Sequence, residues 1–164
     1  MFTRKKIGLC VPNLKPSQRN YFLLMESQKH IKNIDIIIFF EEFSIPYVYT
    51  EFSAMQMNEV WNFTGPLITY SINTLSQIIN APSPSQKFLY LWDLEWTFAD
   101  VFNFNQISNL LRKNDVSVIC RCPEHKEIIE NCWNIKVPLV TDNFENIFNN
   151  DLILKYTNEK TFLI

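Results

Sequence analysis

Short apolar runs alternate with segments of helical pattern along most of this 164-residue chain. Apolar runs of strand length lie at residues 6–11, 34–40, 66–70, 87–92, 116–121 and 137–140. A helical segment opens near residue 15, and others cover residues 53–61, 71–80, 105–113, 123–133 and 142–149. Ser53 is placed to cap the second of these helices, and Pro123 suits a first helical turn. The alternation predicts parallel strands joined by helical crossovers.

The run at residues 34–40 reads IDIIIFF and is apolar on both faces of a strand after Asp35. A central parallel strand needs such a pattern because helices cover both of its faces. We therefore expect an α/β fold, a three-layer Rossmann-like domain with a mostly parallel sheet of about six strands. The length fits one domain over residues 1–164, with residues 155–164 as an edge strand or a loose tail.

The composition is that of a globular chain with an aromatic-rich core. Hydrophobic residues make up 47%, and the chain contains 14 Phe and 4 Trp. The net charge is −2, and Arg4-Lys5-Lys6 is the longest basic run, so nucleic acid is not an expected partner. No apolar segment approaches the roughly 20 residues that cross a bilayer, and four cysteines fit reduced thiols. The expectation is a soluble, cytoplasmic protein without a membrane partner.

The two glycines, Gly8 and Gly65, limit the chemistry of phosphate binding. GxGxxG and Walker-type loops need several glycines so that backbone N–H groups can approach phosphate. No cofactor is therefore expected. The loop at residues 12–17 opens a helix whose N-terminus could hold an anion, and an ordinary capped helix is the simpler interpretation.

Metal binding and nucleophilic catalysis find little support in the pattern. Cys120, Cys122, His125 and Cys132 are zinc-ligand types, but they are strung along a strand end and a helix and do not gather at one point. We expect buried thiols and no metal site. GxSxG is absent, so the sequence identifies no catalytic residue.

The stretch KFLYLWDLEWTF, residues 87–98, turns from an apolar run to Trp92, Asp93, Glu95 and Trp96. The carboxyl ends of parallel strands line the ligand crevice of open α/β sheets. Ser71, Arg121 and His125 follow neighbouring apolar runs and join the candidate site. Aromatic and acidic side chains suit a sugar site or a protein contact. Simple packing of both tryptophans against the core is the alternative.

Three stretches carry a resemblance to a known family: NEVWNFTGPLITYS, KFLYLWDLEW and VICRCPEHKEIIENCWNIKVPLVTDNF. With the order of elements, they resemble the N-terminal Rossmann-like half of two-domain (GT-B-type) glycosyltransferases. They are especially similar to small glycosyltransferase-like proteins of marine T-even-type phages. In that family the C-terminal half mainly binds the nucleotide-sugar donor, and the N-terminal half contributes the acceptor side of the cleft. The resemblance implies that Ser71 and residues 121–127 lie in cleft-facing loops.

Two functions follow as expectations. In the first, the chain is a glycosyltransferase-like domain without independent transferase activity, which acts with a partner chain or as a dimer on a sugar or nucleotide-sugar ligand. In the second, it is a noncatalytic phage accessory or assembly protein that binds another protein through its aromatic and acidic edge. Either would place it in the host cytoplasm if a phage encodes it.

Overall fold

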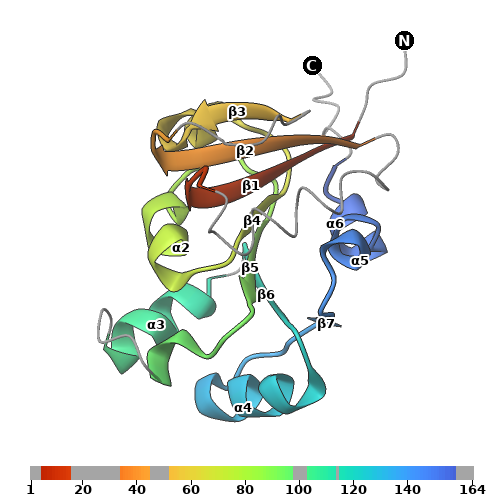
Figure 1. Ribbon diagram of the computed structural model, residues 1–164. Helices are drawn as coiled ribbons and strands as arrows, with labels where there is room; N and C mark the ends of the chain where they lie inside the picture. Colours follow the sequence, from red (N-terminus) through yellow and green to blue (C-terminus); the bar gives the residue numbers. More distant parts are fainter. Residues whose placement is uncertain (1–4, 16–33, 45–51, 98–102, 114, 158–164) are drawn as a thin grey trace, which may run out of the picture.

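The computed structural model describes residues 5–15, 34–44, 52–97, 103–113 and 115–157. Its centre is one seven-stranded sheet in which every pair of neighbouring strands is parallel, in the order β3-β2-β1-β4-β5-β6-β7 (Figure 1). The predicted α/β fold is confirmed, with one strand more than expected. The strands are β1 (Lys5–Asn13), β2 (Ile34–Glu42), β3 (Ser53–Gln56), β4 (Leu67–Thr69), β5 (Lys87–Leu91), β6 (Val116–Cys120) and β7 (Leu139–Val140).

Helices cover both faces of the sheet and complete three layers. One face carries α2 (Ile72–Ile78), α3 (Phe104–Leu111) and α4 (Pro123–Trp133), with the 3₁₀ helices η1 (Met57–Asn62) and η2 (Glu95–Thr97). The other face carries α5 (Phe144–Phe148) and α6 (Asp151–Leu154). Figure 1 shows α2 and α3 on one side of the strands and α5 and α6 on the other. No helix in the described ranges is long and apolar enough to cross a membrane.

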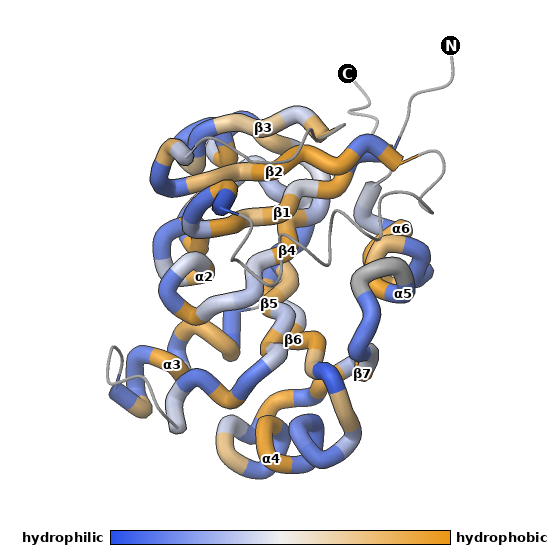
Figure 2. Tube along the Cα trace, viewed as in Figure 1, coloured by the Kyte–Doolittle hydropathy of each residue, from blue (hydrophilic) through white to orange (hydrophobic). Residues whose placement is uncertain are grey.

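The two faces of the central strands form separate hydrophobic cores. Leu89 and Val118 pack with α2, α3 and α4, whereas Ile38 packs with α5 and α6. Strands β1 and β2 are largely orange in the hydropathy colouring of Figure 2, as strands covered on both faces require. Seven residues in the apolar runs that the sequence assigns to strands are all buried: Ile36, Ile38, Phe40, Leu89, Leu91, Val118 and Cys120.

The prediction of a helix over residues 53–61 is wrong at its start. Ser53 does not cap a helix, because residues 53–56 form β3 and pair in parallel with β2. Only Met57–Asn62 is helical, as a 3₁₀ helix. Ala, Met and Gln favour a helix intrinsically, but the open edge of β2 offers backbone hydrogen bonds to an extended segment. This pairing supplies the seventh strand.

Other expectations fall on parts of the chain that the structure leaves undescribed. The helix opening near residue 15 lies outside the described residues from residue 16 on. Of the loop expected at residues 12–17, residues 12 and 13 belong to β1, residues 14 and 15 follow it, and residues 16 and 17 lie outside the described residues. The same holds for residues 158–164 of the predicted tail, whereas residues 155–157 form a turn after α6.

Gly8 lies where three neighbouring side chains approach the backbone of β1. A Cβ atom at this position would overlap the Leu67 side chain and press against the rings of Phe39 and Phe63. The residue therefore allows β1 to pack closely against β4 and against Phe63, the residue that follows η1. Neither glycine of the chain has a positive φ, so packing and not backbone conformation explains this one.

The strand order places a topological switch point between β1 and β4. The chain builds outward from β1 to β2 and β3, then returns to add β4 on the other side of β1. Open α/β sheets bind ligands at such a point, beyond the carboxyl ends of the strands. We call this side of the sheet the carboxyl edge. The register pairs Leu9 with Ile68, so β1 continues to Asn13 beyond the last residue of β4, Thr69.

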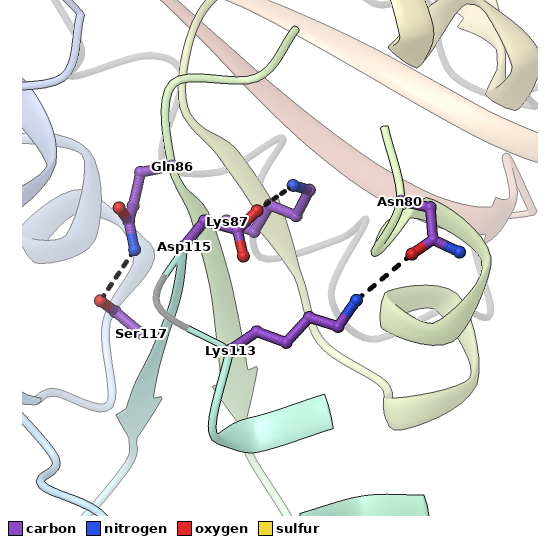
Figure 3. A network of polar contacts seen from close by, with 6 residues as sticks. All are labelled: Asn80, Gln86, Lys87, Lys113, Asp115 and Ser117. Atoms are coloured by element: carbon purple, nitrogen blue, oxygen red, sulfur yellow. Dashed lines mark hydrogen bonds and ion pairs between the residues drawn. The ribbon is translucent and has the colours of Figure 1, made fainter. Parts of the chain in front are cut away.

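The opposite side, the amino edge, carries a polar network between the starts of β5 and β6 (Figure 3). The Lys87 side chain is 1% exposed and forms a close ion pair with Asp115, whose side chain is 43% exposed. Beside it Gln86 donates to Ser117 at 3.1 Å. This network joins the two strands that carry much of the candidate site at their other ends.

Candidate ligand-binding site

The predicted site residues follow β4, β5 and β6 at the carboxyl edge. Ser71 is the N-cap of α2, two residues after the end of β4. Trp92 and Asp93 come directly after β5, and Arg121 directly after β6. Because the strands are parallel neighbours, these segments meet at one edge. The structure groups the predicted residues into two polar clusters and one aromatic cluster.

The first cluster surrounds the start of α2. The Ser71 hydroxyl accepts a hydrogen bond from the Thr74 backbone N–H at 3.0 Å and donates to the Thr74 hydroxyl at 2.8 Å. The Thr74 hydroxyl in turn contacts Glu41 Oε1, at the end of β2, at 3.4 Å. Glu95 Oε2 accepts from the backbone N–H of Ile72 at 2.9 Å. The cluster therefore ties the loop after β5 and the end of β2 to the first turn of α2.

Burial changes the acid–base properties of this cluster. The pKa of Glu95 is raised above its ordinary 4.5, chiefly because burial disfavours the carboxylate; the hydrogen bond from Ile72 opposes the rise, and the nearby charge of Asp93 adds to it. The pKa of Tyr70 is also raised, first by burial and then by the charge of Glu41. The Tyr70 hydroxyl is buried and has no hydrogen-bond partner within the described ranges. The cluster therefore combines a Tyr70 phenol that stays neutral and a Glu95 carboxyl with a raised pKa with the hydroxyls of Ser71 and Thr74.

The second cluster centres on Arg121. Its Nη1 lies 3.4 Å from Asp93 Oδ1, and its Nη2 lies 3.5 Å from His125 Nε2. The guanidinium carbon lies 5.6 Å from the centre of the Trp92 ring, a cation–π distance. The side chains of Arg121 and Asp93 are 35% and 55% exposed, so solvent and a ligand can reach both. Charge, hydrogen bonding and ring contact thus hold one guanidinium in place at an accessible surface.

His125 is held in its neutral form beside this guanidinium. Its pKa is lowered from 6.5, first by burial and then by the positive charge of Arg121; Asp93 and Glu124 oppose the shift. Since the guanidinium can only donate, Nε2 of the imidazole must accept, and we assign the ring proton to Nδ1. That nitrogen is buried and has no acceptor in the part of the chain described. The cluster therefore contains a neutral imidazole whose N–H donor is unused.

Trp96 lies in the aromatic cluster and not beside Arg121. Its ring meets Trp133 edge to face at 5.2 Å, and Phe104 stacks on Trp133 at 4.7 Å. Trp92 in turn packs edge to face on Tyr90 at 5.9 Å. Both tryptophans of the WDLEW stretch are thus partly buried against the core, as the packing alternative expected. Trp92 differs because it also contacts Arg121.

The first cluster also contains Glu41, Tyr70 and Thr74, which were not among the predicted site residues. Glu41 and Thr74 lie 33 positions apart in the sequence and meet only through the fold. The spacing of Ser71 and Thr74 was a usable signal, because a serine N-cap commonly bonds the residue three positions later. The zinc-ligand types do not converge: within the described ranges, no group of three or more His, Cys, Asp or Glu side chains could hold a metal.

Comparison with protein-family models, with curated proteins and with solved structures gave no match to this chain.

Proposed function

We propose that the protein is a glycosyltransferase-like domain that binds a neutral sugar at its carboxyl edge and acts with a partner chain or as a dimer. It contributes the acceptor side of a cleft and has no independent transferase activity. The observation that carries the proposal is Arg121, held between Asp93 and His125 beyond the ends of β5 and β6. This cluster lies on the carboxyl edge, the side on which open α/β sheets bind ligands, on the β4 side of the switch point between β1 and β4.

The polar groups of the second cluster suit sugar hydroxyls, which both donate and accept hydrogen bonds. Asp93 is an exposed acceptor and Arg121 is a partly exposed donor, and the Nδ1 donor of His125 beside them is buried, so it reaches a ligand only when a side chain moves. Buried polar groups without partners favour a ligand that completes their hydrogen bonds.

The charges of the first cluster bear on the class of ligand. Glu95 accepts the Ile72 N–H and thereby occupies an amide that would otherwise be open to an acceptor group of a ligand. Glu41 adds further negative charge beside the start of α2, whereas the charge of Asp93 is paired with Arg121. Like charges repel, so a nucleotide diphosphate fits the first cluster poorly, whereas an uncharged glycan does not meet that repulsion. The proposed ligand is therefore a neutral acceptor sugar and not the nucleotide-sugar donor.

The test is binding of neutral mono- and oligosaccharides and of nucleotide sugars, followed by amide chemical shifts. A double variant, Asp93→Asn with Glu95→Gln, keeps side-chain size and removes both charges. The matched control is Glu59→Gln with Asp151→Asn, which changes exposed carboxyl groups on η1 and α6. The proposal expects a neutral sugar to shift the amides at residues 92–95 and 121–125, and the double variant to weaken binding while the control does not. Tighter binding of a nucleotide sugar, or equal binding by the double variant, would contradict it.

One observation favours a second candidate, a noncatalytic accessory or assembly protein that binds another protein. The Arg121 guanidinium lies over the Trp92 ring, so that ring face is not open for stacking on a sugar. Exposed Arg and Asp side chains above a tryptophan also fit a protein interface. This candidate predicts no sugar binding and a stable complex, recovered by pull-down from the native host and identified by mass spectrometry. Undiminished recovery by the well-folded double variant would exclude this surface as the interface.

A further inference from the structure

His125 contacts Arg121 through a ring nitrogen that gains a proton in acid. Nε2 of His125 lies 3.5 Å from Nη2 of Arg121. A guanidinium has donors only, so this contact is a hydrogen bond only while Nε2 carries no proton. The other ring nitrogen, Nδ1, is buried and has no hydrogen-bond partner in the described part of the chain. The hydrogen bond to Arg121 therefore requires the neutral ring.

Protonation of His125 replaces this hydrogen bond with repulsion. The imidazolium turns an N–H group and a positive charge toward a guanidinium that has the same two features. Asp93, in the loop after β5, acts on both groups: its Oδ1 lies 3.4 Å from Arg121 Nη1, and its charge favours the protonated imidazole. Glu124 of α4 also favours that form, but it is exposed to solvent. In the described residues these are the charged groups that act on the ring, and the single carboxylate of Asp93 cannot neutralise both cations.

The other contacts of Arg121 hold its guanidinium only weakly. Its distance of 3.4 Å to Asp93 is longer than a strong charge-assisted hydrogen bond, about 2.7–2.9 Å, and both side chains are partly exposed. The guanidinium carbon lies 5.6 Å from the centre of the Trp92 ring. Exposed ion pairs and exposed cation–π contacts are both weak interactions. The protonation state of His125 therefore decides where the guanidinium lies.

We propose that neutral His125 is a positioning residue that holds the Arg121 guanidinium where a ligand meets it, and that protonation of His125 displaces the guanidinium and weakens binding. Because the ligand is the neutral sugar of the proposed function, this role of His125 rests on that function. The pKa of His125 is lowered from 6.5, first by burial and then by the charge of Arg121. The positioned state is therefore complete above pH 6.5 and is lost as the pH falls through the folded-state pKa.

The experiment measures sugar affinity from about pH 7.5 to about pH 5, the range in which histidine changes its charge. The probe is the neutral mono- or oligosaccharide that binds the wild-type protein most tightly at the higher pH. The wild-type dissociation constant should rise about two- to fivefold in acid, as expected for an interaction between partly exposed charges.

Two variants of His125 separate positioning from a merely structural role. His125→Gln keeps an acceptor oxygen for Arg121 and cannot gain a charge, so it should bind like the wild type at the higher pH and lose the pH dependence. His125→Phe keeps a ring without an acceptor, so it should bind at both pH values as weakly as the acidified wild type. The matched control is Lys126→Gln, which changes a charge one position further along α4, where the ammonium lies 3.8 Å from Glu130. This control should keep the wild-type pH dependence.

An NMR titration of the His125 ring needs no ligand and is independent of the proposed function. The wild-type midpoint should lie below 6.5, and Arg121→Gln should raise it, because the variant removes the positive charge beside the ring. Lys126→Gln should leave the midpoint unchanged.

Three results would overturn the positioning role of His125. One is a wild-type affinity that is equal at the two pH values, and another is a pH dependence that His125→Gln retains. The third is a His125 midpoint that Arg121→Gln does not raise, which would remove the contact itself. If no neutral sugar binds at either pH, the proposed function and the binding role of His125 fail together, and the NMR titration still decides whether the two side chains are coupled.

Discussion

The buried ion pair of Lys87 and Asp115 at the amino edge makes a quantitative prediction about stability. The Lys87 side chain is 1% exposed, and Asp115 is its ion-pair partner in the described residues (Figure 3). Removing one partner of a buried pair leaves an uncompensated charge and typically costs about 3–5 kcal/mol. Because the Asp115 side chain is 43% exposed, water partly compensates its loss, and we expect Asp115→Asn to cost about 3 kcal/mol.

Replacing the lysine itself should have a much smaller effect. Lys87→Met keeps an unbranched chain of similar length and removes the charge that burial penalises. Apolar replacement of buried ionic groups is often neutral or stabilising, so the change in unfolding free energy should lie within about 1 kcal/mol. In a Lys87→Met background, Asp115→Asn should lose most of its cost. The double-mutant cycle then gives the coupling free energy of the pair.

Urea unfolding of the four proteins measures these differences, provided that the slopes with denaturant remain equal. Lys113→Met is the matched control, because Lys113 lies in the same network but is exposed and donates to Asn80 at 3.2 Å. Its effect should stay within about 0.5 kcal/mol, the scale of surface substitutions. The reasoning would be refuted by an Asp115→Asn cost no larger than the control, or by Lys87→Met costing as much as Asp115→Asn.

Four further predictions concern the core, the close approach at β1, the carboxyl edge and metal. Leu89→Ala should cost about 2–5 kcal/mol by denaturant unfolding, because the side chain is fully buried; a loss below about 0.5 kcal/mol would contradict its place in the core. Gly8→Ala should cost about 1–3 kcal/mol, because the new Cβ overlaps Leu67, and an unchanged melting temperature would show that β1 and β4 can separate. The pKa of Glu95 is higher in the folded protein than in the unfolded chain. Its contribution to stability is therefore present below the unfolded-state pKa of 4.5 and is lost as the pH rises through the folded-state pKa. The stability of wild type relative to Glu95→Gln should therefore increase from pH 7 to pH 4, and an opposite trend would contradict the shift. A strong chelator should leave the melting temperature unchanged, and stoichiometric zinc in the purified protein would refute this.

The strands were predictable where burial on both faces leaves a two-sided apolar pattern. Residues 34–40 and 87–91 carry that pattern, and both became central strands. The carboxyl-edge placement of Asp93 and Arg121 also followed from the sequence, because the end of an apolar run marks the end of a strand. Predicting that the two residues meet also requires β5 and β6 to be parallel neighbours. The alternation of strands and helices predicts parallel strands, and the structure pairs β5 with β6.

The missed features all depend on contacts between distant parts of the chain. β3 has helix-favouring residues, and only the open edge of β2 makes the segment extended. Glu41 and Thr74 lie 33 positions apart in the sequence, and no local sequence pattern predicts their contact. Lys87 begins a strand as an ordinary polar residue would, and its burial is matched by Asp115, which lies in the turn just before β6. Local pattern therefore predicts elements and their ends, whereas pairings across the sheet decide which polar groups are buried.

The polar groups at the two edges of the sheet differ in whether they have hydrogen-bond partners, and this difference supports placing the ligand site at the carboxyl edge. At the amino edge, Lys87 and Gln86 both have partners on the neighbouring strand segment. At the carboxyl edge, buried polar atoms of Thr69, Tyr70 and His125 have no hydrogen-bond partner among the described residues. Outside that edge, the same holds for the indole Nε1 of Trp133. Each such group costs about 1–3 kcal/mol, and native proteins retain them mainly where water, a ligand or a function compensates. The polar groups of the amino edge thus have hydrogen-bond partners, whereas several of those at the carboxyl edge do not. The carboxyl edge is where α/β sheets bind ligands, and this difference is consistent with a ligand that completes those hydrogen bonds.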